Sequence, residues 1–153
     1  MTSSWLRPLR SAVFVLAGCG WLAWASADEL PAVQQQGGIE YLSGGIGQEE
    51  STAIEAESRK WPLTLLFSAR RWQRSVYTAD AKVSLRDSHG KLLLQTQADG
   101  PFLLLRLQPG TYAVEATLDG KPLQQRVVLK KGEPARVVFV WPEVPGDEPA
   151  PQD

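Results

Sequence analysis

Residues 107–129 of the chain, LQPGTYAVEATLDGKPLQQRVVL, decide its fold class. Apolar side chains recur at every second position over 112–118 and, with one exception, over 123–129. This period of two is typical of half-buried β-strands. Asp119 and Gly120 stand between the two runs. Because both residues tolerate the positive φ angles of a type I′ turn, the pair is a strong signal for a tight connection. The stretch therefore predicts a β-hairpin.

Runs of the same character lie on both sides of this hairpin. Alternating or strongly apolar stretches of strand length cover residues 63–68, 81–86, 91–97, 102–107 and 135–141. Turn residues separate them at intervals of roughly 8 to 12 residues. Together with the hairpin they make seven short strands, which predict an all-β domain of the sandwich or small-barrel type.

One helix is expected over residues 48–61, directly before the first of these strands. Two glutamates open the segment and two basic residues close it, an order that the helix dipole favours. Glu55 and Arg59 are spaced to form an i,i+4 ion pair, and Pro62 ends the helix. The apolar stripe of this segment is thin, so the helix must dock on another element to persist.

The first 27 residues have the layout of a secretory signal peptide. Basic residues come first, an apolar run follows over 11–24, and Ala25-Ser26-Ala27 offers a cleavage site. The apolar run is shorter than the roughly 18 to 20 residues that a membrane span needs. We therefore expect a periplasmic protein with no transmembrane span in the mature chain.

Two further segments are expected to lie outside the folded domain. Residues 28–47 are rich in Gly, Gln and Pro and are interpreted as a linker. Residues 142–153 contain four prolines and four acidic residues, and this composition predicts a disordered acidic tail.

Cys19 provides an alternative mode of export. Residues 16–19, LAGC, resemble the lipobox of bacterial lipoproteins, in which the cysteine is acylated and becomes the first residue. Apolar residues continue here to Trp24, whereas a polar linker usually follows a lipoprotein cysteine. Release after Ala27 is therefore favoured, and lipid anchoring at Cys19 is the alternative.

Several motifs of the predicted domain resemble those of carboxypeptidase regulatory-like domains. The resemblance rests on LQPGTYAV at 107–114, VSLRD at 83–87 and DGPF at 99–102, and it spans residues 63–141. It implies a seven-stranded, transthyretin-like (prealbumin-like) Greek-key sandwich of the carbohydrate-binding-like class. The short helix expected from the residue pattern precedes this sandwich. It also implies a non-catalytic accessory role. The glycine-rich segment before the helix is similar to the N-terminal part of small proteobacterial envelope proteins built on this domain.

The sequence shows no recognisable catalytic, metal or cofactor site. A zinc site needs several converging ligands, and the single histidine, His89, lies in an expected turn. The only cysteine falls in the signal segment, so the mature chain has no Cys–His pair for nucleophilic catalysis. Residues 44–47, GGIG, lack the lysine of a phosphate loop. Tyr112 alternates with core positions, so its hydroxyl is expected to bond to the backbone, as in a tyrosine corner.

One segment stands out from the rest of this acidic chain. Arg70, Arg71, Trp72, Arg74 and Tyr77 fall within eight residues, and arginine and aromatic side chains are enriched at binding hot spots. The segment follows the first predicted strand of the sandwich, so we expect it at the end away from the start of the helix. Either it binds a partner, or its aromatic residues cover a sandwich edge while its arginines pair with the glutamates of the helix.

These observations favour a non-catalytic envelope protein that acts as a protein-interaction or accessory module. A module that binds peptidoglycan or another glycan is the alternative. The partner is expected to be an envelope protein or a glycan. Nucleic acid is not expected, because a net charge of −1 provides no basic face for phosphates.

The first prediction concerns processing. The mature chain should begin at Asp28, because the small residues before it fit signal peptidase. Intact-mass measurement of the protein from its native host tests this. A mass that carries a diacylglyceryl group on Cys19, and that disappears in Cys19→Ser, would contradict soluble release.

Overall fold

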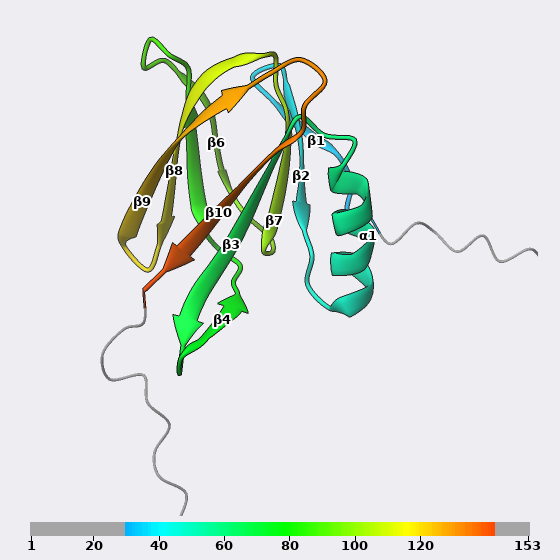
Figure 1. Cartoon of the computed structure of the whole chain (residues 1–153), viewed down its shortest axis with the longest axis vertical. Coiled ribbons are helices and arrows are strands. Elements are labelled where there is room, and N and C mark those ends of the chain that lie inside the picture. Colours follow the sequence, from blue (N-terminus) through cyan, green and yellow to red (C-terminus); the bar gives the residue numbers. More distant parts are fainter. Residues whose placement is uncertain (1–29, 143–153) are drawn as a thin grey trace, which may run out of the picture.

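The computed structural model describes residues 30–142. The predicted signal peptide, Cys19 and the residues from 143 onward lie outside this range. Within it, ten strands form two sheets that pack face to face, and one helix lies on the outer face of the first sheet (Figure 1).

The first sheet, sheet A, has six strands and the second, sheet B, has four. Sheet A has the order β1 (Gln34–Gln36), β2 (Ile39–Gly44), β7 (Phe102–Arg106), β3 (Leu63–Arg71), β10 (Ala135–Trp141), with β4 (Arg74–Tyr77) paired to the end of β3. Sheet B has the order β6 (Leu92–Gln97), β5 (Lys82–Arg86), β8 (Gly110–Leu118), β9 (Lys121–Leu129). The helix, α1, covers Gln48–Ser58.

The chain crosses between the sheets in the manner of a Greek key. β5 and β6 form a hairpin in sheet B, the chain then passes to β7 in sheet A, and β8 returns to pair with β5. β10 pairs with β3 in parallel, which requires a crossover rather than a hairpin. A mainly-β sandwich with one short N-terminal helix, as the sequence predicts, is confirmed.

Three strands were not predicted, so the count of seven is wrong. All seven predicted regions form strands, and the structure adds β1, β2 and β4. The linker assigned to 28–47 is therefore wrong over β1 and β2. Ile39 and Tyr41 of β2 enter the core between the sheets, and β2 pairs along β7. That pairing covers an edge of β7 that a seven-stranded sandwich would leave open.

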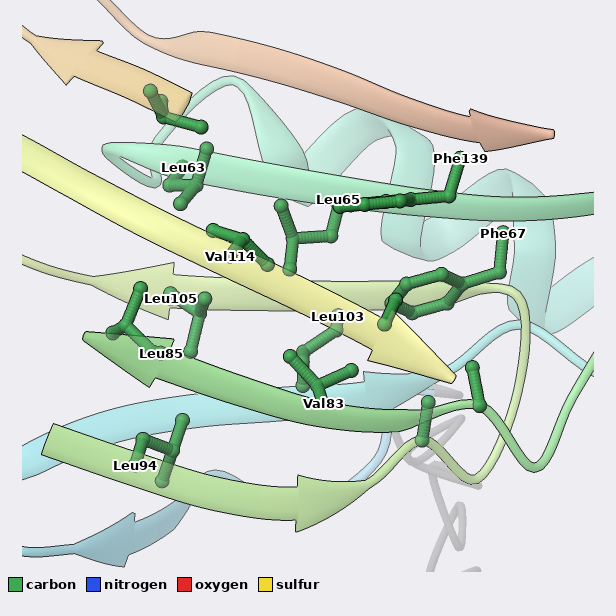
Figure 2. Close-up of a cluster of buried hydrophobic side chains, with 14 of the residues drawn as sticks. Leu63, Leu65, Phe67, Val83, Leu85, Leu94, Leu103, Leu105, Val114 and Phe139 are labelled. Atoms are coloured by element: carbon green, nitrogen blue, oxygen red, sulfur yellow. The ribbon is translucent and has the colours of Figure 1, made fainter. Parts of the chain in front are cut away.

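Alternate side chains of both sheets fill the space between them (Figure 2). Leu85 and Val114, which are register partners on β5 and β8, are 0% and 1% exposed. Lys82, on the same strand as Leu85, is exposed. The predicted register of these strands is therefore correct.

The tight turn and the tyrosine of the fold-deciding stretch also match the prediction. Asp119 and Gly120 have φ angles of 49° and 74°, as a type I′ turn requires, and they join β8 directly to β9. The Tyr112 hydroxyl donates a hydrogen bond of 2.7 Å to the Gln108 carbonyl oxygen. Burial, with the nearby charge of Asp87, raises the pKa of Tyr112. Its hydroxyl therefore stays protonated as a donor near neutral pH.

A second, smaller core lies on the outer face of sheet A, under the helix. Ile54 of α1 and Trp61 after it are 0% and 2% exposed, and they pack against Leu42, Leu66 and the side chains of β7. This docking supplies the support that the thin apolar stripe of the helix requires.

The helix is shorter than predicted and its ion pair differs. α1 ends at Ser58. Beyond it, the backbone N–H groups of Lys60 and Trp61 donate hydrogen bonds to the carbonyl oxygens of Glu57 and Ser58. These bonds bring Trp61 back under the helix, where the guanidinium of Arg106 lies 4.5 Å from its ring centroid. The predicted Glu55–Arg59 pair is wrong, because Glu55 pairs with Arg136 of β10.

The second prediction tests the register of sheet B. Leu85→Ala should lower the free energy of unfolding by about 2 to 4 kcal/mol, because it leaves a cavity in a fully buried site. Lys82→Ala, on the same strand but exposed, should change it by less than about 0.5 kcal/mol. Chemical denaturation measures both. Equal losses in the two variants would contradict the register.

Candidate functional site

The five predicted site residues all lie on one β-hairpin, formed by β3 and β4 (Figure 1). Arg70 and Arg71 end β3, Trp72 lies in the turn, and Arg74 and Tyr77 begin and end β4. All five are exposed. Trp72 is 54% and Tyr77 57% exposed, so neither is a core residue.

The turn of this hairpin has an unfavourable sequence. Trp72 and Gln73 have φ angles of 47° and 64°, so both central residues adopt the left-handed conformation of a type I′ turn. Asn and Gly adopt it readily, whereas a bulky residue there costs of order 1–3 kcal/mol. The two-residue turns at Gly37-Gly38 and at Asp119-Gly120 use residues that suit this geometry. Trp72 thus lies exposed at the tip of the hairpin, and its left-handed backbone conformation destabilises the turn.

β4 has one side bonded to β3 and one side directed outward. Thr78 N–H, just after β4, donates to Phe67 O. Because bonding alternates along an antiparallel pair, the backbone groups of Ser75 and Tyr77 point away from β3. Within residues 30–142, β4 has no second strand partner. This side of β4 is therefore a short sheet edge on which another strand could pair.

Tyr77 reaches a groove that the other predicted residues do not. The groove has a volume of about 1040 Å³ and is bounded by residues 45–47, by one face of α1 along its length, by residues 77–79 and by Pro101 and Phe102. The Tyr77 ring meets Phe102 edge to face, with ring centroids 5.9 Å apart. The hairpin and the start of the helix thus lie at the same end of the domain.

The expectation that the hairpin lies away from the helix start is therefore wrong. The chain reverses at Pro62, so α1 and β3 run in roughly opposite directions (Figure 1). The first turn of the helix then lies beside the last residues of the strand. β4 next folds back and brings Tyr77 toward the glycines before α1.

Charged residues from distant parts of the chain meet in the groove. Arg136 of β10 bonds to Glu55 of α1 at 2.6 Å, and both side chains are nearly half exposed. Arg59 lines the same groove. Sequence reasoning missed Arg136, because it is 81 residues from Glu55 and lies in an ordinary strand pattern.

Exposed apolar side chains also lie on β10. Val138 and Val140 are register partners of Leu66 and Ser68, so they lie on the outer face of sheet A. Each is 41% exposed, and Ile46 at the groove rim is 64% exposed. α1 therefore covers only part of this face.

The glycine segment before α1 is already occupied by the chain's own carboxylate. The Glu50 carboxylate accepts the Gly45 N–H at 2.6 Å, and Ser51 Oγ donates to the Gly45 carbonyl oxygen. Glu50, in the first turn of α1, thus bonds back to the glycine segment that precedes the helix.

The described side chains form no metal-binding cluster. Within residues 30–142 no three His, Cys, Asp or Glu side chains lie close enough to hold an ion. His89 is in a turn, where Asp87 Oδ1 accepts the backbone N–H groups of His89 and Lys91 at 2.9 Å. Glu57, whose pKa is lowered by its hydrogen bond from Lys60, lies at the end of α1 beside Trp61.

The comparisons with known proteins identify no family. No protein-family model and no curated protein matches the sequence. Among solved structures, GBS52, the minor pilin of Streptococcus agalactiae, aligns with 16% identity and a TM-score of 0.45. The alignment covers 78% of this chain and 66% of the pilin, so the chain spans slightly less than two thirds of the pilin's length. The carboxypeptidase regulatory-like family stays a prediction.

A membrane-spanning helix is not found in the described part of the chain. No helix within residues 30–142 has the length and apolar character to cross a bilayer.

The third prediction asks whether Trp72 has a structural role. In the double variant Trp72→Asn, Gln73→Gly the turn residues suit the type I′ geometry, so the free energy of unfolding should stay constant or rise by about 1 kcal/mol. Denaturant titration measures this, with Gln73→Gly alone as the control for the backbone. A loss of more than about 1 kcal/mol that is specific to the Trp72 change would show that Trp72 packs as a structural residue.

Proposed function

We propose that this chain is a non-catalytic, exported binding module that holds a segment of a partner protein against the outer face of sheet A. One observation carries the proposal: α1 covers this face only in part, and the uncovered part is a groove with exposed apolar side chains. Exposed apolar patches rimmed by polar residues mark interaction sites. Ile46 and Tyr77 line the groove, and Val138 is exposed on the same strand as the groove residue Arg136.

The groove suits an extended peptide. The outward backbone groups of Ser75 and Tyr77 offer one short edge for main-chain hydrogen bonds, the usual basis of strand addition. Pro101, Phe102 and Tyr77 beside this edge offer apolar contacts for alternate side chains. A partner segment that adds to β4 would therefore place every second side chain into the groove.

The charges favour acidic residues in that segment. Arg59 and Arg136 line the groove with a single acidic residue, Glu55, which Arg136 already neutralises. Three more arginines lie on the adjacent hairpin at 70, 71 and 74. Opposite charges steer association and fix the register of the partner. An extended segment with alternating apolar and acidic residues fits best.

The polar groups of the groove support binding rather than catalysis. Two of its hydroxyls donate to nearby backbone carbonyl oxygens, Ser51 to Gly45 and Thr52 to Gln48. Its carboxylate, Glu55, is held by Arg136. A nucleophile needs an adjacent base that is free to take its proton, and none of these groups has one.

The fourth prediction tests this proposal by peptide selection. Peptides of random sequence displayed on phage should be selected on the immobilised full chain. The recovered peptides should be rich in acidic and apolar residues. Their affinity should fall about tenfold, which corresponds to about 1.4 kcal/mol, in Tyr77→Ser and in Arg136→Gln.

The matched control is Val128→Ser on the outer side of β9. Val128 is 59% exposed, almost the same as Tyr77, but it does not line the groove. It should bind the selected peptides like the unchanged protein. Equal losses in the Tyr77 and Val128 variants would contradict the groove as the site. Retention on peptidoglycan that is lost in Trp72→Asn would contradict the proposal and favour the glycan-binding alternative.

A further inference from the structure

We infer that the basic tip of the β3–β4 hairpin is the docking surface for the chain's own acidic segment, residues 143–153. The tip consists of Arg70, Arg71 and Arg74 around the Trp72 turn. This inference concerns the arginines rather than the groove, and it holds whether or not the groove takes a peptide.

The end of β10 lies at this tip, immediately before the acidic segment begins. β10 runs parallel to β3 and ends at Trp141, whose register partner is Ala69. β3 continues for two more residues, Arg70 and Arg71, beyond the end of β10 (Figure 1). A chain that leaves β10 in the direction of the strand therefore passes these two arginines first.

Side-chain contacts confirm that the end of β10 and the arginines are neighbours. A small pocket of about 30 Å³ is lined jointly by Arg70, Arg71, Lys121, Trp141 and Pro142. Asp119 also lines it, so the pocket has three cationic residues and one anionic residue. The Trp141 indole N–H donates to the Lys121 carbonyl oxygen at 2.8 Å, which fixes the end of the strand at this place.

The sequence that follows Pro142 is complementary in charge. Residues 143–153, EVPGDEPAPQD, contain four acidic residues and no lysine or arginine. The first of them, Glu143, follows Pro142 in the sequence, and Pro142 lines the pocket. Hydrogen bonds between arginine and carboxylate groups are among the stronger polar contacts because both partners are charged.

The length of the segment is sufficient to cover the tip. At about 3.3 Å per residue, eleven residues can extend roughly 35 Å, whereas the four residues of β4 span roughly 13 Å. The segment is tethered at the edge of its docking surface, so its effective concentration there is on the order of millimolar. Contacts too weak to hold a free peptide can therefore hold this one. The prolines at 145, 149 and 151 also reduce the conformational freedom lost on docking.

The fifth prediction uses a spin label on the acidic segment. Cys19 is the only cysteine of the sequence, so the full chain with Cys19→Ser and Ala150→Cys takes the label at one site. The label should broaden the amide NMR signals of residues 70–76. In 1 M NaCl, where the screening length is about 3 Å, the broadening should fall at least about twofold.

Charge variants separate docking from mere proximity. Replacing Arg70, Arg71 and Arg74 by Gln should reduce the broadening as salt does. The matched control replaces Lys82, Lys91 and Arg126 by Gln, which removes the same charge from exposed positions associated with sheet B, and it should leave the broadening unchanged. A charge swap, with glutamates at the three hairpin positions and lysines at 143, 147 and 148, should restore the broadening that the glutamine variant loses.

Two results would overturn the inference. One is broadening that depends on neither salt nor the hairpin arginines, because a tethered but undocked segment would behave in this way. The other is broadening in a mixture of labelled chains with separate ¹⁵N-labelled chains that carry no spin label. That result would show that the segment docks on a second copy instead.

Discussion

The fold depends on one constraint: sheet A is apolar on both faces. Leu63, Leu65 and Phe67 of β3 face the core between the sheets, while Leu66 faces the opposite side. Packing against sheet B can bury only the first face. The helix covers part of the second through Ile54 and Trp61, and fully burying such a side chain contributes about 1.5–3 kcal/mol. The sheet therefore needs α1 to bury its outer face, and α1 needs the sheet because few of its own residues are apolar.

The remaining features near the site follow from how α1 is brought to this face. The chain must turn from β2 into α1 within three residues, and Gly100 allows the close approach that this turn needs. A Cβ atom on Gly100 would clash with the backbone of Gly44. The helix then covers β2, β7 and β3 but stops short of β10, since Val138 and Val140 stay 41% exposed. The groove is the boundary between the covered and the uncovered part of the face.

The β3–β4 hairpin extends sheet A beyond this covered region, and it combines features that stability alone does not explain. Its turn places Trp72 in a left-handed conformation, and its arginines are exposed. A left-handed conformation costs energy at a bulky residue, and ion pairs of exposed side chains contribute little to stability. Both make sense if the hairpin meets other groups: a partner segment on the side of Tyr77, and the acidic residues after Pro142 on the side of Arg70. The two proposals together divide the residues that were predicted as one site between two neighbouring surfaces.

The sequence by itself determined the features that depend on local pattern. Alternating runs and apolar runs of strand length located seven strands, Asp119-Gly120 specified a two-residue turn, and the position of Tyr112 predicted its hydroxyl contact. The clustering of Arg70 to Tyr77 also marked the candidate site. Only the tertiary structure decided what those elements meet. β2 lacks a distinctive pattern, because five of its six residues are buried, on both faces of the strand, by contacts with β7, α1 and the core. The pairing of Glu55 with Arg136 joins residues 81 positions apart. The groove has no signature in the sequence, since it arises where a helix ends its cover of a sheet, and that boundary depends on the packing of the whole chain.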